Sequence, residues 1–100
     1  MKVKELKDLI NQEDDLYSLW DAEDIIPRGI TKVANGLDLD QRRWFSTATD
    51  VYKCEDGFVG VNGVFQVFSE GMPYSDCGRL CVAFECEAVQ SVTYKPKGVK

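Results

Sequence analysis

The chain has 100 residues, of which 12 are basic and 17 are acidic, and its formal net charge is −5. Its 44% hydrophobic and 29% charged residues are typical of one folded domain and argue against disorder. The absence of histidine excludes nucleophiles activated by histidine, histidine general bases and histidine metal ligands.

The sequence favours a cytoplasmic location. The first residues carry charges throughout and lack the apolar core of a signal peptide. No apolar run approaches the roughly 18 residues that a membrane span requires. We therefore expect a cytoplasmic protein that makes no contact with a membrane.

The negative charge is concentrated at the start of the chain. Residues 1–24 hold three basic and eight acidic residues, which accounts for the whole net charge of −5. Within this stretch, residues 13–24 contain six carboxylates and no basic residue, interleaved with Leu16, Tyr17, Leu19 and Trp20. The pattern is typical of a solvated helix face whose aromatic residues seal the core, and it also suits a surface that binds a basic protein.

Helical structure is expected before residue 27. Residues 2–12 carry apolar side chains at helical spacing, namely Val3, Leu6, Leu9 and Ile10. Asp14 or Asp15 is expected to cap a second short helix that carries Trp20. Pro27 ends this region because it disfavours the helical conformation at the residue before it. One bent helix and two short helices both fit.

Beyond residue 30 the hydrophobic period changes from helical to alternating, which predicts strands. We expect a short strand over residues 30–35, a turn over 36–40 and a long strand over 42–54. Residues 58–68 are expected to return as the next strand.

Asp56 and Gly57 form the strongest hairpin signal in the chain. A two-residue turn at these positions pairs Cys54 with Val59 and Tyr52 with Val61. One face of the hairpin then carries an apolar set that should pack against the N-terminal helix: Trp44, Ala48, Tyr52, Cys54, Val59, Val61, Phe65 and Val67. The other face, with Lys53, Thr49, Thr47, Asn62 and Gln66, is expected to be mostly exposed to solvent. Gly60 and Gly63 indicate bulges or a close approach of another chain segment.

The last third of the chain predicts a loop followed by strand structure. Residues 69–79 contain Gly71, Pro73 and Gly78 and are expected to form the loop. Residues 80–94 fit one long strand or two strands joined near Gln90. The buried face is expected to carry Leu80, Val82, Phe84 and Cys86, and the opposite face Cys81, Glu85 and Glu87.

Together these elements predict a single domain over residues 1–100 of the α+β class. An N-terminal helix, or two short helices, packs on a curved antiparallel sheet of three to four strands in a meander. The acidic helical element spans residues 1–26, the sheet spans residues 30–95 and a loose tail spans residues 96–100.

The four cysteines are Cys54, Cys77, Cys81 and Cys86. Free thiols are expected in a reducing compartment. A four-thiolate zinc site and a Cys77–Cys81 disulfide are the alternatives, although the usual pair of Cys-x-x-Cys knuckles is absent. The sequence therefore predicts no cofactor and no metal, and it leaves the redox state of the thiols open.

Two further residue groups carry alternative chemistries. Asp50 points to the buried face in the simple register, where a carboxylate would need partners, and a bulge that turns it outward is the expected solution. Arg42 and Arg43 precede Trp44 in a basic and aromatic cluster that could hold nucleic acid, but Trp44 is expected to be core and the acidic chain disfavours nucleic acid.

The leading hypothesis is a small intracellular, non-catalytic module that binds or regulates a protein partner of unknown identity. An accessory or inhibitor protein of a mobile element is one version of it, and a homodimer through a strand edge is compatible with it. The expected protein-binding residues are Asp14, Asp15, Tyr17, Trp20, Asp21, Glu23 and Asp24. The first alternative is a carboxylate-dependent enzyme or ligand-binding domain with a pocket near Asp50 and Tyr52. The second is a nucleic-acid binder that uses Arg42 and Arg43.

Overall fold

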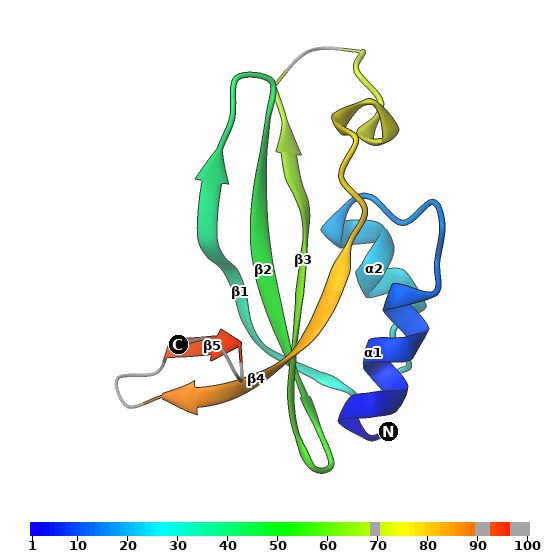
Figure 1. Ribbon diagram of the computed structural model, residues 1–100, viewed down its shortest axis with the longest axis vertical. Helices are drawn as coiled ribbons and strands as arrows, with labels where there is room; N and C mark the ends of the chain where they lie inside the picture. Colours follow the sequence, from blue (N-terminus) through cyan, green and yellow to red (C-terminus); the bar gives the residue numbers. More distant parts are fainter. Residues whose placement is uncertain (69–70, 90–92, 97–100) are drawn as a thin grey trace.

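The computed structural model describes residues 1–68, 71–89 and 93–96, which form two helices, one short 3₁₀ turn and five strands. In chain order the elements are α1 (Val3–Asn11), α2 (Leu19–Ile25), β1 (Thr31–Gln41), β2 (Phe45–Cys54), β3 (Gly57–Val67), η1 (Tyr74–Cys77), β4 (Val82–Val89) and β5 (Thr93–Pro96). Both helices lie on one side of a twisted sheet (Figure 1). No helix within these ranges is long and apolar enough to cross a membrane.

The strands form an antiparallel meander in which the spatial order β1-β2-β3-β4-β5 follows the chain. This confirms the α+β class, the N-terminal helices and the curved, open sheet. The final stretch forms two strands, β4 and β5, so the sheet has five; the join expected near Gln90 lies outside the described residues. Pro96, the first residue of the predicted tail, pairs with Cys86, and residues 97–100 are likewise outside the described residues.

The N-terminal region forms two short helices, one of the two expected arrangements. In α1, Val3, Leu6 and Ile10 are buried against the sheet, as their spacing predicts. The start of α2 differs from the prediction, because Ser18 rather than Asp14 or Asp15 is the cap.

The connection between the helices explains the later start of α2. The backbone N–H groups of Val64 and Cys81 donate to the carbonyls of Tyr17 and Leu16, at 2.9 and 2.7 Å. These bonds hold the segment extended against the sheet until Ser18, whose hydroxyl accepts from the N–H of Asp21 at 3.1 Å. The helix therefore begins where the strand-like contact ends.

The β2–β3 turn lies one residue earlier than predicted. Cys54 pairs with Gly57 and Tyr52 with Val59, so Glu55 and Asp56 form the turn. The N-terminus fixes this position, because Asp56 accepts a hydrogen bond from the N–H of Val3 at 2.8 Å. Pairing partners shift by two residues, which preserves the face of every side chain near the turn.

The face of the hairpin that was expected to meet the helices does so over most of its length. Ala48, Tyr52, Cys54, Val59 and Val61 are buried in one cluster with residues of both helices. The position of Trp44 was predicted wrongly, since its side chain is 50% exposed. Strand β2 begins at Phe45, three residues later than predicted, so Trp44 belongs to the connection from β1.

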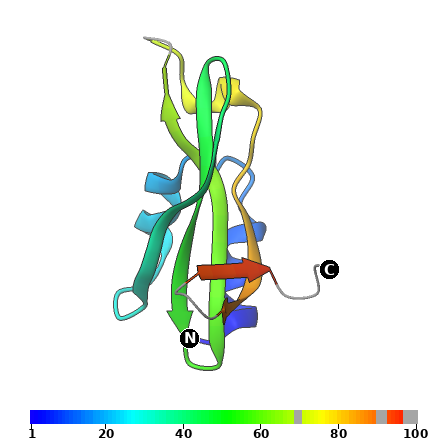
Figure 2. The same ribbon diagram turned by 90° about the vertical axis from the view of Figure 1, so that its left-hand side faces the viewer.

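The opposite face was expected to be mostly wet, and this was wrong for Thr47 and Thr49, which are buried. The sheet curls toward this face (Figure 2), and the side chains of Phe84 and Cys86 lie directly over Gly60. A Cβ at Gly60 would come within 2.6 Å of the Phe84 ring, so the predicted close approach is confirmed there.

Strand β1 also differs from the prediction of a short strand and a turn. It runs without interruption over 11 residues and pairs with β2 through three register shifts. Gly36 and Asp38 have positive φ angles of 67° and 51°, which allow the extra residues of such bulges. The bulges add curvature and explain why the chain between residues 36 and 40 does not turn.

The predicted parity of β4 was wrong at its start. Leu80 and Val82 are exposed, whereas Cys81 and Ala83 are buried beneath the helices. Asn11 at the end of α1 sets this register, because its side chain donates to the carbonyl of Ala83 at 3.0 Å and accepts from its N–H at 2.8 Å.

Candidate functional site

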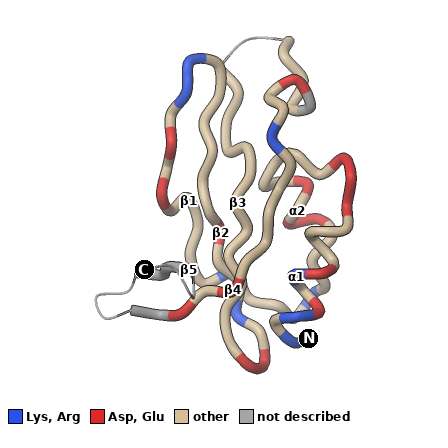
Figure 3. Tube along the Cα trace, viewed as in Figure 1, with Lys and Arg blue, Asp and Glu red and all other residues tan. Residues whose placement is uncertain are grey.

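The expected protein-binding residues occupy one continuous part of the chain, the connection between the helices and α2. We call the surface formed by Glu13, Asp14, Asp15, Asp21, Glu23 and Asp24 the acidic surface; all six are exposed. Figure 3 shows these acidic residues along the connection and α2, whereas a basic segment lies at the β1–β2 hairpin. Tyr17 is only partly exposed, and Trp20 stands out at 61% exposure.

Most carboxylates of the acidic surface are not neutralised. Of its six carboxylates, Glu23 alone makes an ion pair within the described part of the chain; the other five make none. Tryptophan is enriched among the few residues that supply most of the affinity at binding surfaces.

A cavity of about 70 Å³ opens beside Trp20. We call it the Trp20 pocket; its lining residues are Leu19, Trp20, Glu23, Lys32, Asn35, Asp50 and Phe65. Helix α2 provides one wall and strands β1, β2 and β3 provide the others. The structure thus brings together the acidic surface and Asp50, which the sequence assigned to separate hypotheses.

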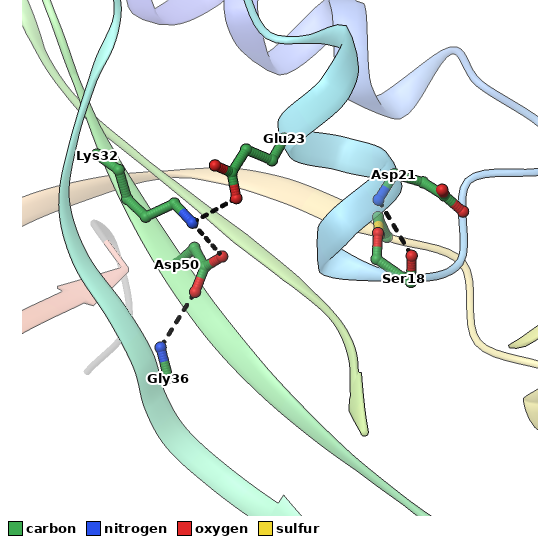
Figure 4. Close-up of polar contacts among 7 residues, drawn as sticks. Ser18, Asp21, Glu23, Lys32, Gly36 and Asp50 are labelled. Atoms are coloured by element: carbon green, nitrogen blue, oxygen red, sulfur yellow. Dashed lines mark hydrogen bonds and ion pairs between the residues drawn. The ribbon is translucent and has the colours of Figure 1, made fainter. Parts of the chain in front are cut away.

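Lys32 links the two walls of the Trp20 pocket (Figure 4). Its ammonium group lies 2.7 Å from a carboxylate oxygen of Glu23 on α2 and 3.4 Å from one of Asp50 on β2. Burial, the largest single influence, lowers the pKa of Lys32, but the hydrogen bond to Glu23 and the charge of Asp50 outweigh it and raise the pKa overall. Lys32 is therefore a permanent cation near neutral pH.

Asp50 is buried, with only 4% of its surface exposed. The expected bulge that would turn Asp50 outward does not occur, because the buried carboxylate has Lys32 and the backbone of Gly36 as partners. The N–H of Gly36 donates to the second carboxylate oxygen of Asp50 at 3.1 Å. The bulged path of β1, with Gly36 in the left-handed region, positions this N–H. The predicted bulge at Asp50 was therefore wrong, and the bulges that accompany this contact lie in β1.

Tyr52, the other residue of the pocket hypothesis, is buried next to Lys32, whose Nζ lies 5.8 Å from the centre of its ring. Within the described residues its hydroxyl has no hydrogen-bond partner. Burial and the nearby charges of Asp50 and Glu23 raise the pKa of Tyr52 well above its usual value. The hydroxyl therefore stays protonated near neutral pH.

The pocket residue that the sequence did not single out is Lys32. It pairs with Tyr52 across β1 and β2, and Tyr52 lies two residues from Asp50 along β2. The sequence did contain a signal for Lys32. A buried carboxylate such as Asp50 is normally paired with a cation, and Lys32 is the one basic residue of the neighbouring strand β1. Using this signal required the register between β1 and β2.

The basic and aromatic cluster lies at the opposite end of the sheet, in the β1–β2 connection. We call Arg42, Arg43 and Trp44 the hairpin tip. Arg42 pairs with Asp40 at 2.9 Å, and the guanidinium carbon of Arg43 lies 4.8 Å from the centre of the Trp44 ring. Both cations are thus already engaged by neighbouring groups.

The four cysteines are free thiols spread over the molecule. Cys54 and Cys81 are buried on the helix-covered face, and Cys86 lies on the opposite face over Gly60. Burial raises the pKa of the Cys81 thiol to about 12 and that of the Cys86 thiol to about 11. Among the described residues no three cysteines or carboxylates are grouped to hold a metal ion.

Comparisons with protein-family models, with curated proteins and with solved structures found no match to this chain. Its function must therefore be inferred from its own surfaces.

Proposed function

We propose that this chain is a small, intracellular, non-catalytic module that binds a basic segment of a protein partner on the acidic surface. The observation that carries the proposal is Trp20, which is 61% exposed among six carboxylates, five of which have no ion pair in the described residues. Burying such an indole against a partner would remove a large apolar area from water, and the unpaired carboxylates would steer a basic chain toward it.

The chemistry of the Trp20 pocket supports binding over catalysis. A general acid or base works best with a pKa near the operating pH. The pKa values of Lys32 and Tyr52 are raised above their usual values, which already lie well above neutral pH. Neither side chain therefore readily exchanges a proton at neutral pH. Lys32, which lines the pocket, is better suited to hold a fixed positive charge beside a bound group.

A strand-edge homodimer is less well supported. Strand β1 is an edge of the sheet, but it carries three register shifts and two residues with positive φ. Such bulges interrupt the regular row of N–H and C=O groups that a second strand would need. We therefore favour α2 over the edge of β1 as the binding surface.

The test is a titration of the full chain with a capped basic peptide, (Gly-Lys)₄, followed by NMR at low and at high salt. We expect saturable binding that weakens as salt rises, with shifts confined to residues 13–24 and their neighbours. A variant with Asp14, Asp15 and Asp24 changed to Lys should lose this binding.

The matched control reverses three exposed carboxylates elsewhere, Asp8, Asp76 and Glu87, with the same change in net charge. If this control loses binding as completely as the acidic-surface variant, net charge alone explains the interaction and the proposal is wrong. Absence of binding to the unmodified chain at low salt would refute it as well.

A further inference from the structure

We propose that the Trp20 pocket is the anchor of this binding surface and receives one arginine side chain of the basic partner. The inference rests on the proposed function and adds the chemical group that the surface selects. It is carried by the geometry of the cavity, its charge and the nature of its walls.

The charges that line the cavity leave one negative charge uncompensated. Glu23 and Asp50 each contribute one carboxylate, and Lys32 contributes the single cation between them. Asp50 is almost fully buried, so water screens its charge poorly. One further cation would neutralise the cavity, whereas an anion would add to the excess.

The size and walls of the cavity suit a guanidinium group. A volume of about 70 Å³ admits the head of one side chain but not a larger ligand. Trp20 and Phe65 supply aromatic surface, and a guanidinium stacks on such rings while losing less hydration than an ammonium group does. Leu19 adds an apolar wall for the methylene stem.

Acceptors are available for the N–H groups of a guanidinium. The carboxylate of Glu23 is 48% exposed and uses one oxygen for Lys32. The carboxylate of Asp50, which also lines the cavity, holds Lys32 at the longer distance of 3.4 Å. Five N–H donors in a planar fork can reach several such acceptors at once. An ammonium group is a point charge, and Lys32 already fills that role here.

The experiment compares two capped peptides of equal charge, (Gly-Arg)₄ and (Gly-Lys)₄, with the full ¹⁵N-labelled chain. Its two tryptophans give two indole N–H signals, so Trp44 serves as an internal reference for Trp20. We expect the arginine peptide to shift the Trp20 signal and to bind about five-fold more tightly than the lysine peptide, since a cation stacked on an indole contributes of that order.

Two pairs of variants locate the preference. Trp20→Ala should abolish the preference for arginine, whereas Trp44→Ala, which removes a comparably exposed indole at the hairpin tip, should keep it. Glu23→Gln should weaken the preference, whereas Glu13→Gln removes the same charge from the acidic surface outside the pocket and should leave it unchanged. All four side chains are exposed, so the variants are expected to fold.

The outcomes separate the two proposals. Equal affinity for both peptides, or an arginine preference that survives Trp20→Ala, would overturn the arginine anchor while leaving the acidic surface as a binding site. Failure of both peptides to bind would overturn the proposed function, and the anchor with it.

Discussion

The two tryptophans of this chain occupy contrasting sites at similar exposure. Trp20 is 61% exposed on an acidic helix and borders a cavity, whereas Trp44 is 50% exposed at the hairpin tip. Trp44 already has a cation over its ring, because Arg43 stacks on it at 4.8 Å. The comparison teaches that exposure alone does not define a binding residue. What distinguishes Trp20 is a neighbouring cavity in which two carboxylates, Glu23 and Asp50, share the single cation Lys32.

The same contrast holds for the ion pairs of the two sites. Lys32 and Asp50 pair in the Trp20 pocket with Asp50 buried, while Arg42 and Asp40 pair at the hairpin tip with both side chains about half exposed. Water competes with the second pair much more than with the first. Five predictions are ordered from the largest expected effect to the smallest, and the first compares these two ion pairs directly.

Removing the buried carboxylate should have the largest consequence. We expect Asp50→Ala to lower the free energy of unfolding by about 3 kcal/mol, since it deprives Lys32 and the Gly36 N–H of a buried partner. The matched variant Asp40→Ala should lose less than about 1 kcal/mol. Urea denaturation of both variants measures the difference. Equal losses would mean that the two ion pairs do not differ as described.

The second prediction concerns alkaline pH and Cys81, whose thiol lies beneath the start of α2, 3.4 Å from the carbonyl oxygen of Ser18. Burial raises the pKa of this thiol from 9.0 to about 12, so the folded chain keeps a proton that the unfolded chain releases. Stability is therefore fully present below about pH 9 and is lost as pH rises toward 12.

Between pH 8.5 and 10.5, this one group should remove about 2 kcal/mol of stability. Over the same interval, the free energy of unfolding of Cys81→Ala should fall by about 2 kcal/mol less than that of the unmodified chain. Urea unfolding at both pH values measures this difference. Cys77→Ala, at a more exposed thiol in η1, is the control and should change the pH dependence less. A Cys81→Ala variant with an unchanged pH dependence would contradict the burial of the thiol.

The comparison also separates what the sequence could predict from what it could not. Alternation placed Ala48 and Tyr52 on the helix-covered face, and this was right although the turn lay elsewhere, because a two-residue shift of partners preserves the face. The acidic surface was visible as a charge pattern in the chain, whereas the sequence left open whether Trp20 seals the core or is exposed.

Features that depend on partners distant in the chain were not predictable in this way. The bulges of β1 depend on its contacts with β2 and on positive φ at Gly36 and Asp38, which local composition suggested only as a turn. Lys32 was missed for the same reason, since its place beside Asp50 follows from that register. Trp44 was assigned to the core because an alternating pattern does not reveal where a strand begins.

The third prediction tests how α2 is positioned. Ser18→Ala should lower the free energy of unfolding by about 1 kcal/mol, because the N–H of Asp21 loses the hydroxyl that caps the helix. Asp15→Ala, at a cap expected from the sequence but not found, should have no such effect on stability. Thermal unfolding compares the two variants. If Asp15→Ala is the more damaging, the helix starts earlier than described.

The smallest effect is expected at the hairpin tip. In a Trp20→Phe background, Trp44 is the only tryptophan, and Arg43→Ala removes the cation stacked on it. We expect a loss of about 0.5–1 kcal/mol in stability and a clear rise in acrylamide quenching of Trp44 fluorescence. Arg42→Ala is the matched control, because it removes an arginine that pairs with Asp40 without uncovering the indole.

Uncovering Trp44 should still not turn the hairpin tip into an arginine site. With Trp20 intact, Arg43→Ala removes the cation stacked on Trp44, while Arg42 stays paired with the exposed carboxylate of Asp40. We therefore expect the affinity for (Gly-Arg)₄ to stay within about two-fold of the unmodified chain, since exposed charge pairs contribute little. A marked gain in affinity would show that a free aromatic face near a carboxylate is sufficient, and the Trp20 pocket would then lose its special role.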